Sequence, residues 1–225
     1  MTSPVTSLIR VVIIDDEALI RTGFSYILNA AADIEVVATA DGVGAIDVLD
    51  ETHPDVVLLD IRMPGRDGLS VLREIRARGW DMTVAILTTF DSDDHIAAAL
   101  EGGAAGFLVK DTDPRQLPQL VRTLHGGGVV FSPTVSRSVV AGYLRPEAGA
   151  DTGLVDGLTE REKEILVHLG RGLSNAQIGS EMFLSPATVK AHISTILSKL
   201  GVEGRVSAAL VAERAGLLRE AGGAR

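Results

Sequence analysis

The stretch "VVLLDIRMPG", Val56 to Gly65, determines how the first half of the chain folds. Four apolar residues follow one another without a polar interruption, which is typical of a strand covered on both faces. Pro64 and Gly65 then predict a turn. Such a strand would carry the carboxylate of Asp60 at its C-terminal tip. In parallel sheets ligands bind at this edge, so Asp60 is the first candidate site residue.

Further short apolar or β-branched runs alternate with amphipathic stretches through the first half. Five strand–helix pairs predict a doubly wound, five-stranded parallel sheet (flavodoxin-like) with helices on both faces. Pro114 suits the first position of the last helix. We expect strands at Ile9–Ile14, Ile34–Ala40, Val56–Asp60, Thr83–Thr88 and Gly106–Val109. We expect helices at Ala18–Ala30, Val43–Glu51, Gly68–Arg78, Ser92–Gly102 and Pro114–His125.

Polar side chains end several of these strands. Each one alone is explained by a turn, a helix cap or a solvated charge. All of them at equivalent strand ends favour a functional site. The residues are Asp15 and Asp16 after the first strand, Asp60 on the third, Thr88 on the fourth and Lys110 after the fifth.

The residue types indicate the chemistry of this site. Acidic oxygen ligands suit a hard cation that keeps several waters, so we expect Mg²⁺ (magnesium). A carboxylate beside such a cation can attack a phosphoryl group, which makes Asp60 a candidate phosphoacceptor. Lys110 and Thr88 could hold the other phosphoryl oxygens. The expected metal ligands are Asp15, Asp16, Asp60 and the main-chain carbonyl of Arg62.

Composition and charge limit the other possibilities. The 225 residues are 46% hydrophobic and include no cysteine, which excludes disulfides and thiolate metal sites. No apolar run approaches the ~20 residues that span a bilayer, and no export signal is evident, so we expect a cytoplasmic protein without membrane contact. Residues 1–130 carry 10 Lys and Arg against 20 Asp and Glu, a net charge of −10, while residues 131–225 carry +1. This asymmetry predicts two domains with different partners.

The first-half motifs carry a family resemblance. "DDE" (Asp15–Glu17), "LLDIRMPGRDG" (Leu58–Gly68), "TTF" (Thr88–Phe90) and "AAGFLVKD" (Ala104–Asp111) resemble the receiver domain of bacterial two-component response regulators. The resemblance implies that Asp60 accepts a phosphoryl group from a sensor histidine kinase, with Mg²⁺ required. It also implies that Thr88 and Phe107 form a switch pair, although core packing alone would explain Phe107.

The second half begins with a stretch of small residues, Pro and Gly, which predicts a linker with a short helix around Val135–Tyr143. Four short helices follow. Thr159 and Glu162 form a capping box, Ser174 or Asn175 caps a second helix, and Ser185-Pro186 begins a third. Gly201 ends the third helix, and the fourth covers Val202–Leu217. This helix–turn–helix pattern predicts a DNA reader.

On a helical wheel the third helix has an apolar side and a small, polar side. The apolar side holds Val189, Ile193, Ile196, Leu197 and Leu200, and the opposite side holds Ala187, Ala191, Ser194 and Ser198. Small residues would let the helix backbone lie deep in a major groove. A solvated face on an ordinary helical bundle gives the same pattern, so periodicity alone leaves this open.

"LTEREKEIL", "GLSNAQIGSEMFLSPATVKAHISTILSKLGV" and "RVSA" resemble the LuxR-type helix-turn-helix domain, and the whole chain resembles a response regulator of the NarL/FixJ kind. The resemblance implies that the protein binds double-stranded DNA and that the last helix pairs two copies, with a homodimer expected on phosphorylation. The implied DNA contacts are Thr188, Lys190 and His192, with Asn175 and Ser185 near the backbone. Ser194 faces the groove where some relatives carry a long basic residue, so a base contact there does not follow. The expected domains are a receiver at 8–126, a linker at 127–153 and a DNA-binding domain at 154–220.

Two alternatives to a phosphorylation-controlled transcription factor remain. An aspartyl-phosphate hydrolase also uses an Asp at a strand end, but it would want a second acid where Arg62 stands, so we do not expect an enzyme. A DNA-binding regulator with an inactive, unphosphorylated receiver is the other alternative. The acidic pair, Thr88 and Lys110 argue against it.

Overall fold

The computed structural model describes residues 8–89, 93–131, 135 and 152–220. These residues fall into two compact units, and the chain passes between units after residues 90, 105 and 125. Most of the expected linker and of the helix expected at Val135–Tyr143 lies outside the described residues. The domain boundaries therefore stay a prediction. No described helix is long and apolar enough to cross a membrane.

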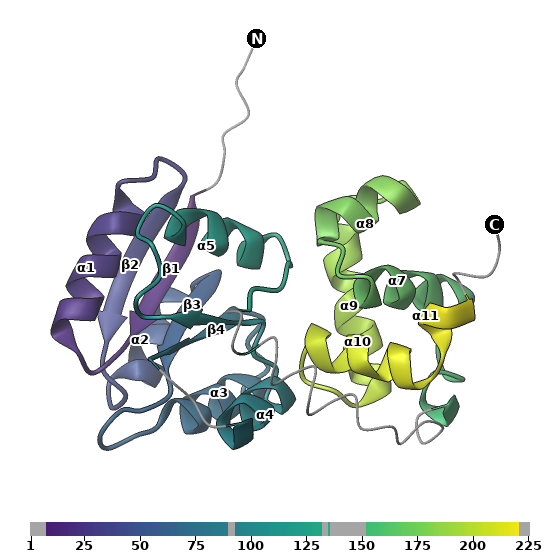
Figure 1. Ribbon diagram of the computed structural model, residues 1–225, viewed down its shortest axis with the longest axis horizontal. Coiled ribbons are helices and arrows are strands. Elements are labelled where there is room, and N and C mark those ends of the chain that lie inside the picture. The colour runs from purple at the N-terminus through teal and green to yellow at the C-terminus, as the bar shows by residue number, and fades with distance from the viewer. Residues whose placement is uncertain (1–7, 90–92, 132–134, 136–151, 221–225) are drawn as a thin grey trace, which may run out of the picture. The chain divides into compact units, whose positions relative to one another are not determined.

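The first unit contains a five-stranded parallel sheet in the order β2-β1-β3-β4-β5 (Figure 1). The strands are β1 (Ile9–Ile14), β2 (Ile34–Ala40), β3 (Val56–Asp60), β4 (Thr83–Thr88) and β5 (Gly106–Val109). All five predicted strands are confirmed. All five residues of β3 are buried, which explains why its sequence is continuously apolar up to Asp60.

Helices cover both faces of this sheet, which confirms the doubly wound fold (Figure 1). Helix α1 packs against α5, whereas α2 packs against α3, as right-handed crossovers in this strand order require. The helices are α1 (Ala18–Asn29), α2 (Ala45–Thr52), α3 (Gly68–Ala77) and α5 (Leu117–His125). Helix α4 (Asp93–Glu101) connects β4 to β5 in the sequence.

The expected start of α5 was wrong. Pro114 lies three residues before the helix, in a turn that Asp113 organises. The Asp113 carboxylate accepts from the backbone N–H of Arg115 at 2.9 Å, and its carbonyl accepts from the N–H of Gln116 at 2.8 Å. This local turn competes with the helix and delays its start to Leu117.

A bidentate ion pair ties α5 to the segment before β2. Arg122 Nε and Nη2 each donate to one oxygen of Asp33, both at 2.7 Å. Two parallel charge-assisted hydrogen bonds fix both distance and orientation. The last helix of the unit is thereby held against a residue 89 positions earlier in the chain.

The C-terminal helices form a separate core. They are η1 (Thr152–Leu154), α7 (Glu160–Gly170), α8 (Asn175–Met182), α9 (Pro186–Leu200), α10 (Arg205–Arg214) and α11 (Leu217–Glu220). The expected Thr159–Glu162 capping box is present, Ser174 caps α8 and Ser185 caps α9. The expected apolar side of α9 is buried against the other helices, with Leu197 partly buried.

The single fourth helix expected at Val202–Leu217 was wrong. Helix α10 ends at Arg214, and α11 begins at Leu217. Gly216 between them has φ of +82°, a left-handed conformation that an α-helix cannot continue through.

Candidate functional site

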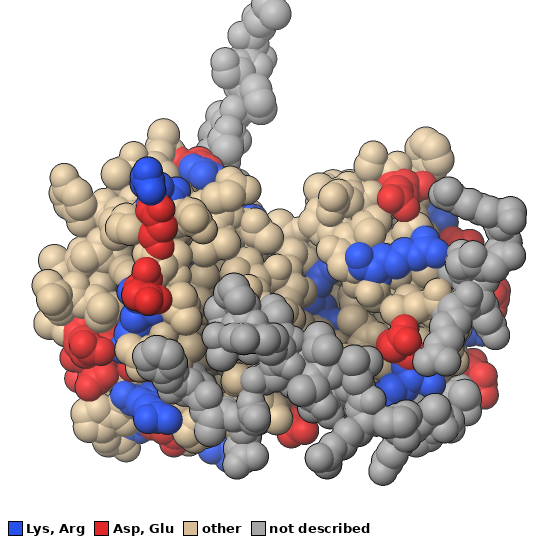
Figure 2. All heavy atoms as spheres, viewed as in Figure 1, with Lys and Arg blue, Asp and Glu red and all other residues tan. Residues whose placement is uncertain are grey.

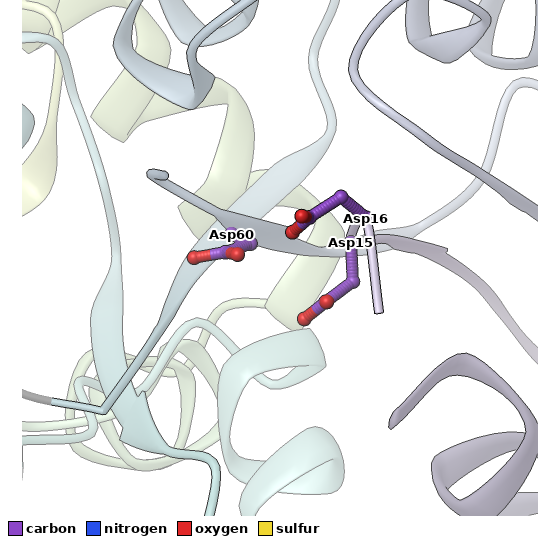
Figure 3. Close-up of side chains that lie close together, drawn as sticks. All are labelled: Asp15, Asp16 and Asp60. Atoms are coloured by element: carbon purple, nitrogen blue, oxygen red, sulfur yellow. The ribbon is translucent and has the colours of Figure 1, made fainter. Parts of the chain in front are cut away.

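Three carboxylates converge where the order of the strands reverses. Asp15 and Asp16 follow β1, and Asp60 ends the neighbouring β3 (Figure 3). One ligand oxygen from each lies within 4.8 Å of the others. Asp15 and Asp60 are buried, whereas Asp16 is exposed. The predicted acidic cluster is confirmed at the edge where doubly wound sheets bind ligands.

The loop after Asp60 folds back onto the end of β3. The backbone N–H of Gly68 donates to the carbonyl of Ile61 at 2.9 Å. A Cβ atom at position 68 would overlap the carbonyl oxygen of Asp60, so only glycine fits there. Asp67 caps α3 by accepting from the N–H of Ser70 at 2.9 Å. The sequence "LLDIRMPGRDG" thus fixes the backbone that carries the Asp60 carboxylate.

Lys110, directly after β5, joins these acids. Its Nζ donates to Asp60 Oδ2 at 2.9 Å and to Asp15 Oδ1 at 3.1 Å. The lysine side chain is only 8% exposed. Side chains from β1, β3 and β5 therefore meet in one buried ion cluster, as their positions at equivalent strand ends predicted.

Glu17 is a member of the cluster that the sequence did not reveal. Its Oε1 accepts from Lys110 Nζ at 2.8 Å, although the Glu17 side chain is 57% exposed. Its N–H also donates to Asp15 Oδ1 at 2.9 Å. The signal in the sequence was the third acid of "DDE", which had no assigned role.

Burial and hydrogen bonding have opposite effects on the pKa values of these groups. Burial raises the pKa of Asp15, although the hydrogen bonds from Lys110 and from the Glu17 N–H lower it in part. Burial opposes the charge of Lys110, but its hydrogen bonds to Glu17, Asp15 and Asp60 outweigh burial and raise its pKa. Lys110 is therefore fully charged at neutral pH.

The cluster suits a hard cation. Asp15 Oδ2 is buried and accepts no hydrogen bond from the described residues, although Lys110 Nζ lies at 2.9 Å from it. The single positive charge of Lys110 faces the carboxylates of Asp15, Asp16 and Asp60, and a bound cation would offset more of their negative charge. Three carboxylates without nitrogen or sulfur ligands fit Mg²⁺ better than a transition metal.

The other predicted residues of this site lie around the cluster. Thr88 ends β4 and is buried, and its carbonyl accepts from the N–H of Lys110 at 2.9 Å. Phe107 is 1% exposed within β5. The N–H of Arg62 donates to Asp60 Oδ1 at 3.2 Å, which places Arg62 beside the carboxylate. The roles of Thr88, Phe107 and the Arg62 carbonyl stay predictions.

The second candidate surface is on α9. Ser185, Thr188, Lys190 and Ser194 are exposed, whereas His192 and Asn175 are partly exposed. Ser185 Oγ accepts from the N–H of Thr188 at 3.0 Å, and Ser194 Oγ donates to the Lys190 carbonyl at 3.2 Å. On the face that Figure 2 shows, this part of the chain carries both basic and acidic side chains, consistent with its near-neutral charge.

Comparisons with known proteins account for both surfaces. Residues 11–122 match the response regulator receiver domain, and residues 156–212 match the luxR family of bacterial regulatory proteins. The transcriptional regulatory protein LnrK of Bacillus subtilis (strain 168) is 37% identical over 218 residues, which cover 93% of this chain and 99% of LnrK. The nitrate/nitrite response regulator protein NarP of Escherichia coli (strain K12) is 40% identical over 205 residues, which cover 90% of this chain and 93% of NarP.

The chain is a DNA-binding two-component response regulator of the LuxR family. Among solved structures, response regulator ChrA of a heme-sensing two-component system matches with a TM-score of 0.51 and 38% identity, covering 94% of this chain and 99% of ChrA. The matched relatives are transcriptional regulators and not enzymes, as expected from the sequence. In this response regulator the acidic cluster lies in the matched receiver region, and α9 lies in the matched luxR region.

Proposed function

We propose that a sensor histidine kinase phosphorylates Asp60 and that this modification controls DNA binding by the C-terminal domain. The observation that carries the proposal is the pair of buried side chains Asp60 and Lys110, whose Oδ2 and Nζ atoms lie 2.9 Å apart beside two further aspartates. A carboxylate held at the edge of the sheet and paired with the Lys110 ammonium is suited to act as a nucleophile toward a phosphoryl group. The proposed domains are the receiver at 8–126, the linker at 127–153 and the DNA-binding domain at 154–220.

Mg²⁺ would be held by Asp15, Asp16, Asp60 and the Arg62 carbonyl. When bound, it would offset the negative charge that develops on the transferred phosphoryl group. Lys110, whose Nζ lies 2.9 Å from Asp60 Oδ2, would provide a second positive charge. Thr88, at the end of β4, would bind a phosphoryl oxygen through its hydroxyl.

Thr88 and Phe107 would transmit the change. Both are buried on neighbouring strands, β4 and β5, so a shift of the Thr88 hydroxyl toward a phosphoryl group would leave space for the aromatic ring. The surface near these strands would then differ between the two states. Such a two-state difference is what phosphorylation needs in order to regulate a distant surface.

Helix α9 would lie in the major groove. Thr188, Lys190 and His192 would reach base edges or phosphates, and Asn175 and Ser185 would contact the backbone near the helix start. Ser194 Oγ donates its hydrogen to the Lys190 carbonyl of its own helix at 3.2 Å, so we assign no base contact to Ser194. Two phosphorylated copies would pair through residues 202–217 and bind two half-sites in the cytoplasm.

Incubation with acetyl phosphate tests the proposal. With Mg²⁺, the intact mass should increase by one phosphoryl group, and without Mg²⁺ it should not. The isosteric Asp60→Asn variant should gain nothing while keeping its circular dichroism spectrum. Phosphorylation should also shift the protein from monomer to dimer in light scattering and tighten DNA binding. Equal labelling of Asp60→Asn would exclude Asp60, and unchanged DNA affinity after labelling would favour a phosphorylation-independent regulator.

A further inference from the structure

Phe183 lies in the turn between α8 and α9, and both its exposure and its backbone conformation are unusual for a phenylalanine. Its side chain is 94% exposed, more than any other large apolar side chain among the described residues. Its backbone is left-handed, with φ of 56° and ψ of 42°. This conformation ends helices most often at glycine, sometimes at asparagine, and it is unfavourable for a bulky residue.

The turn itself imposes this conformation. The carbonyl of Gly179 accepts from the N–H of Phe183 and, at 2.8 Å, from the N–H of Leu184. A Cβ atom at Gly179 would lie only 2.5 Å from the Leu184 carbonyl oxygen, so the chain passes close to α8 here. Arg161 Nη2 donates to the Met182 carbonyl at 2.7 Å and holds the end of α8 from α7. The left-handed position is thus determined by its neighbours and not by Phe183.

The phenyl group does not stabilise the fold through packing. Because the ring is almost fully exposed, it buries no apolar area, and a glycine or asparagine would satisfy the turn at lower cost. Local rules that a sequence breaks without structural gain indicate a functional position. The function must therefore use an exposed aromatic ring at this turn.

The position of the turn indicates the partner. Phe183 lies two residues before Ser185, which caps α9, and the chain then continues into the exposed residues Thr188 and Lys190. In a helix-turn-helix the first turns of the second helix enter the major groove, so the preceding turn lies at the rim of the groove. Deoxyribose carbons and thymine methyl groups offer apolar surface there.

We propose that Phe183 packs against apolar surface of the bound DNA, either a deoxyribose or a thymine methyl group at the rim of the major groove. The inference rests on the proposed DNA-reading role of α9 and adds a contact without charge. Phe183 would contribute affinity that does not depend on salt, because it displaces no counterions. Lys190, in contrast, would contribute a salt-dependent part.

The test uses the full chain and a duplex that the unaltered protein selects from a random-sequence pool. Phe183→Asn should weaken binding about tenfold, as expected for losing one buried phenyl contact. The slope of log affinity against log salt should stay unchanged. The melting temperature should stay equal or rise, because asparagine tolerates the left-handed backbone better. Phe183→Leu, which keeps apolar surface, should lose less affinity than Phe183→Asn.

Controls separate this inference from the proposed function. Tyr26→Asn removes another aromatic side chain, 81% exposed on α1, and should leave DNA affinity unchanged. Lys190→Ala serves as the reference for α9. If Lys190→Ala weakens binding and Phe183→Asn does not, the inference is wrong and the DNA-reading role of α9 stands. If the unaltered protein selects no duplex, the proposed function itself fails.

Further outcomes support or overturn the contact. A probe with uracil in place of thymine should bind the unaltered protein more weakly if the ring contacts a thymine methyl group, and equally well if it contacts deoxyribose. Either result, together with the Phe183→Asn loss, supports the contact. A Phe183→Asn variant that loses DNA affinity together with helicity or thermal stability would overturn the proposed contact. A Phe183→Asn variant with normal DNA affinity but lost transcription would also overturn it and would assign the ring to a protein partner.

Discussion

Glu17 Oε1 and Lys110 Nζ form an ion pair of 2.8 Å at the rim of the acidic cluster. Lys110 thus divides its three hydrogens among Glu17, Asp15 and Asp60. A phosphoryl oxygen can receive a hydrogen from Lys110 only if one of these carboxylates gives it up. The most exposed of the three, Glu17, is the least costly to release.

Glu17→Gln should therefore speed phosphorylation of Asp60 by a small anionic donor at saturating Mg²⁺. The change weakens one partner of Lys110 and removes one negative charge near the site. An exposed pair is worth about 0.2–1 kcal/mol, so the gain in rate should not exceed about fivefold. Stopped-flow measurement with acetyl phosphate tests this, and Glu35→Gln on β2 is the control of equal charge change. A slower Glu17→Gln variant would contradict the expectation.

Gly68→Ala should destabilise the first unit by roughly 1–3 kcal/mol, the usual cost of overpacking. The added Cβ overlaps the Asp60 carbonyl oxygen, so α3 or the end of β3 must move. Phosphorylation should slow as well, because the Asp60 carboxylate moves with its backbone. Urea unfolding and labelling rates measure the two effects. Gly23→Ala in α1, where nothing lies within 4 Å of the new Cβ, should be neutral or stabilising.

Glu162 should make the stability of the C-terminal domain depend on pH. Its hydrogen bonds with Lys199 at 2.7 Å and with Thr159 lower its pKa from 4.5 to about 2. A lowered pKa in the folded state means that stabilisation is complete above pH 4.5 and is lost as the pH falls toward 2. The difference in unfolding free energy between the unaltered protein and Glu162→Gln should therefore shrink between pH 5 and pH 2.5. Denaturation curves at several pH values measure it, and a constant difference would disprove the assignment.

Lys190→Ala should weaken DNA binding and, if Lys190 contacts a phosphate, lower the salt slope by about one unit. If Lys190 reads a base, the loss should be about 1–3 kcal/mol at one base pair, with little change in non-specific binding. Titrations at several salt concentrations, on selected and scrambled duplexes, separate the two. Glu160→Ala, at an exposed residue at the start of α7, serves as a surface control. Unchanged affinity for the selected duplex would mean that another face of α9 contacts DNA.

The sheet could be predicted because its signal is local and redundant. The apolar runs Val11–Ile14 in β1 and Val56–Leu59 in β3 are continuous, since these residues are buried, and the strand order then brings the aspartates at the two strand ends together. The convergence of Lys110 with Asp15 and Asp60 at one edge was expected from topology, whereas their hydrogen bonds are seen only in the structure. The apolar side of α9 was equally clear, because burial at helical spacing leaves a direct trace in the sequence.

Several remaining features depend on local backbone conformations of similar free energy, between which the sequence pattern does not decide. The turn at Asp113 displaced the start of α5, and the left-handed backbone of Gly216 divided the expected fourth helix. Glu17 is 93 positions from Lys110, so its pairing needs the assembled fold. Phe183 is apolar but exposed, and a hydrophobicity pattern predicts that apolar residues are buried. It therefore cannot predict the exposure of Phe183.

The ion pair between Arg122 and Asp33 has a consequence for how the first unit forms during synthesis. Asp33 precedes the edge strand β2, and its ion-pair partner Arg122 lies in α5. Helix α1 also packs against α5. The ribosome must therefore complete about the first 125 residues before this side of the sheet is covered. Until then the nascent chain exposes an incomplete apolar face, and the unit becomes resistant to proteases only when its final helix has emerged.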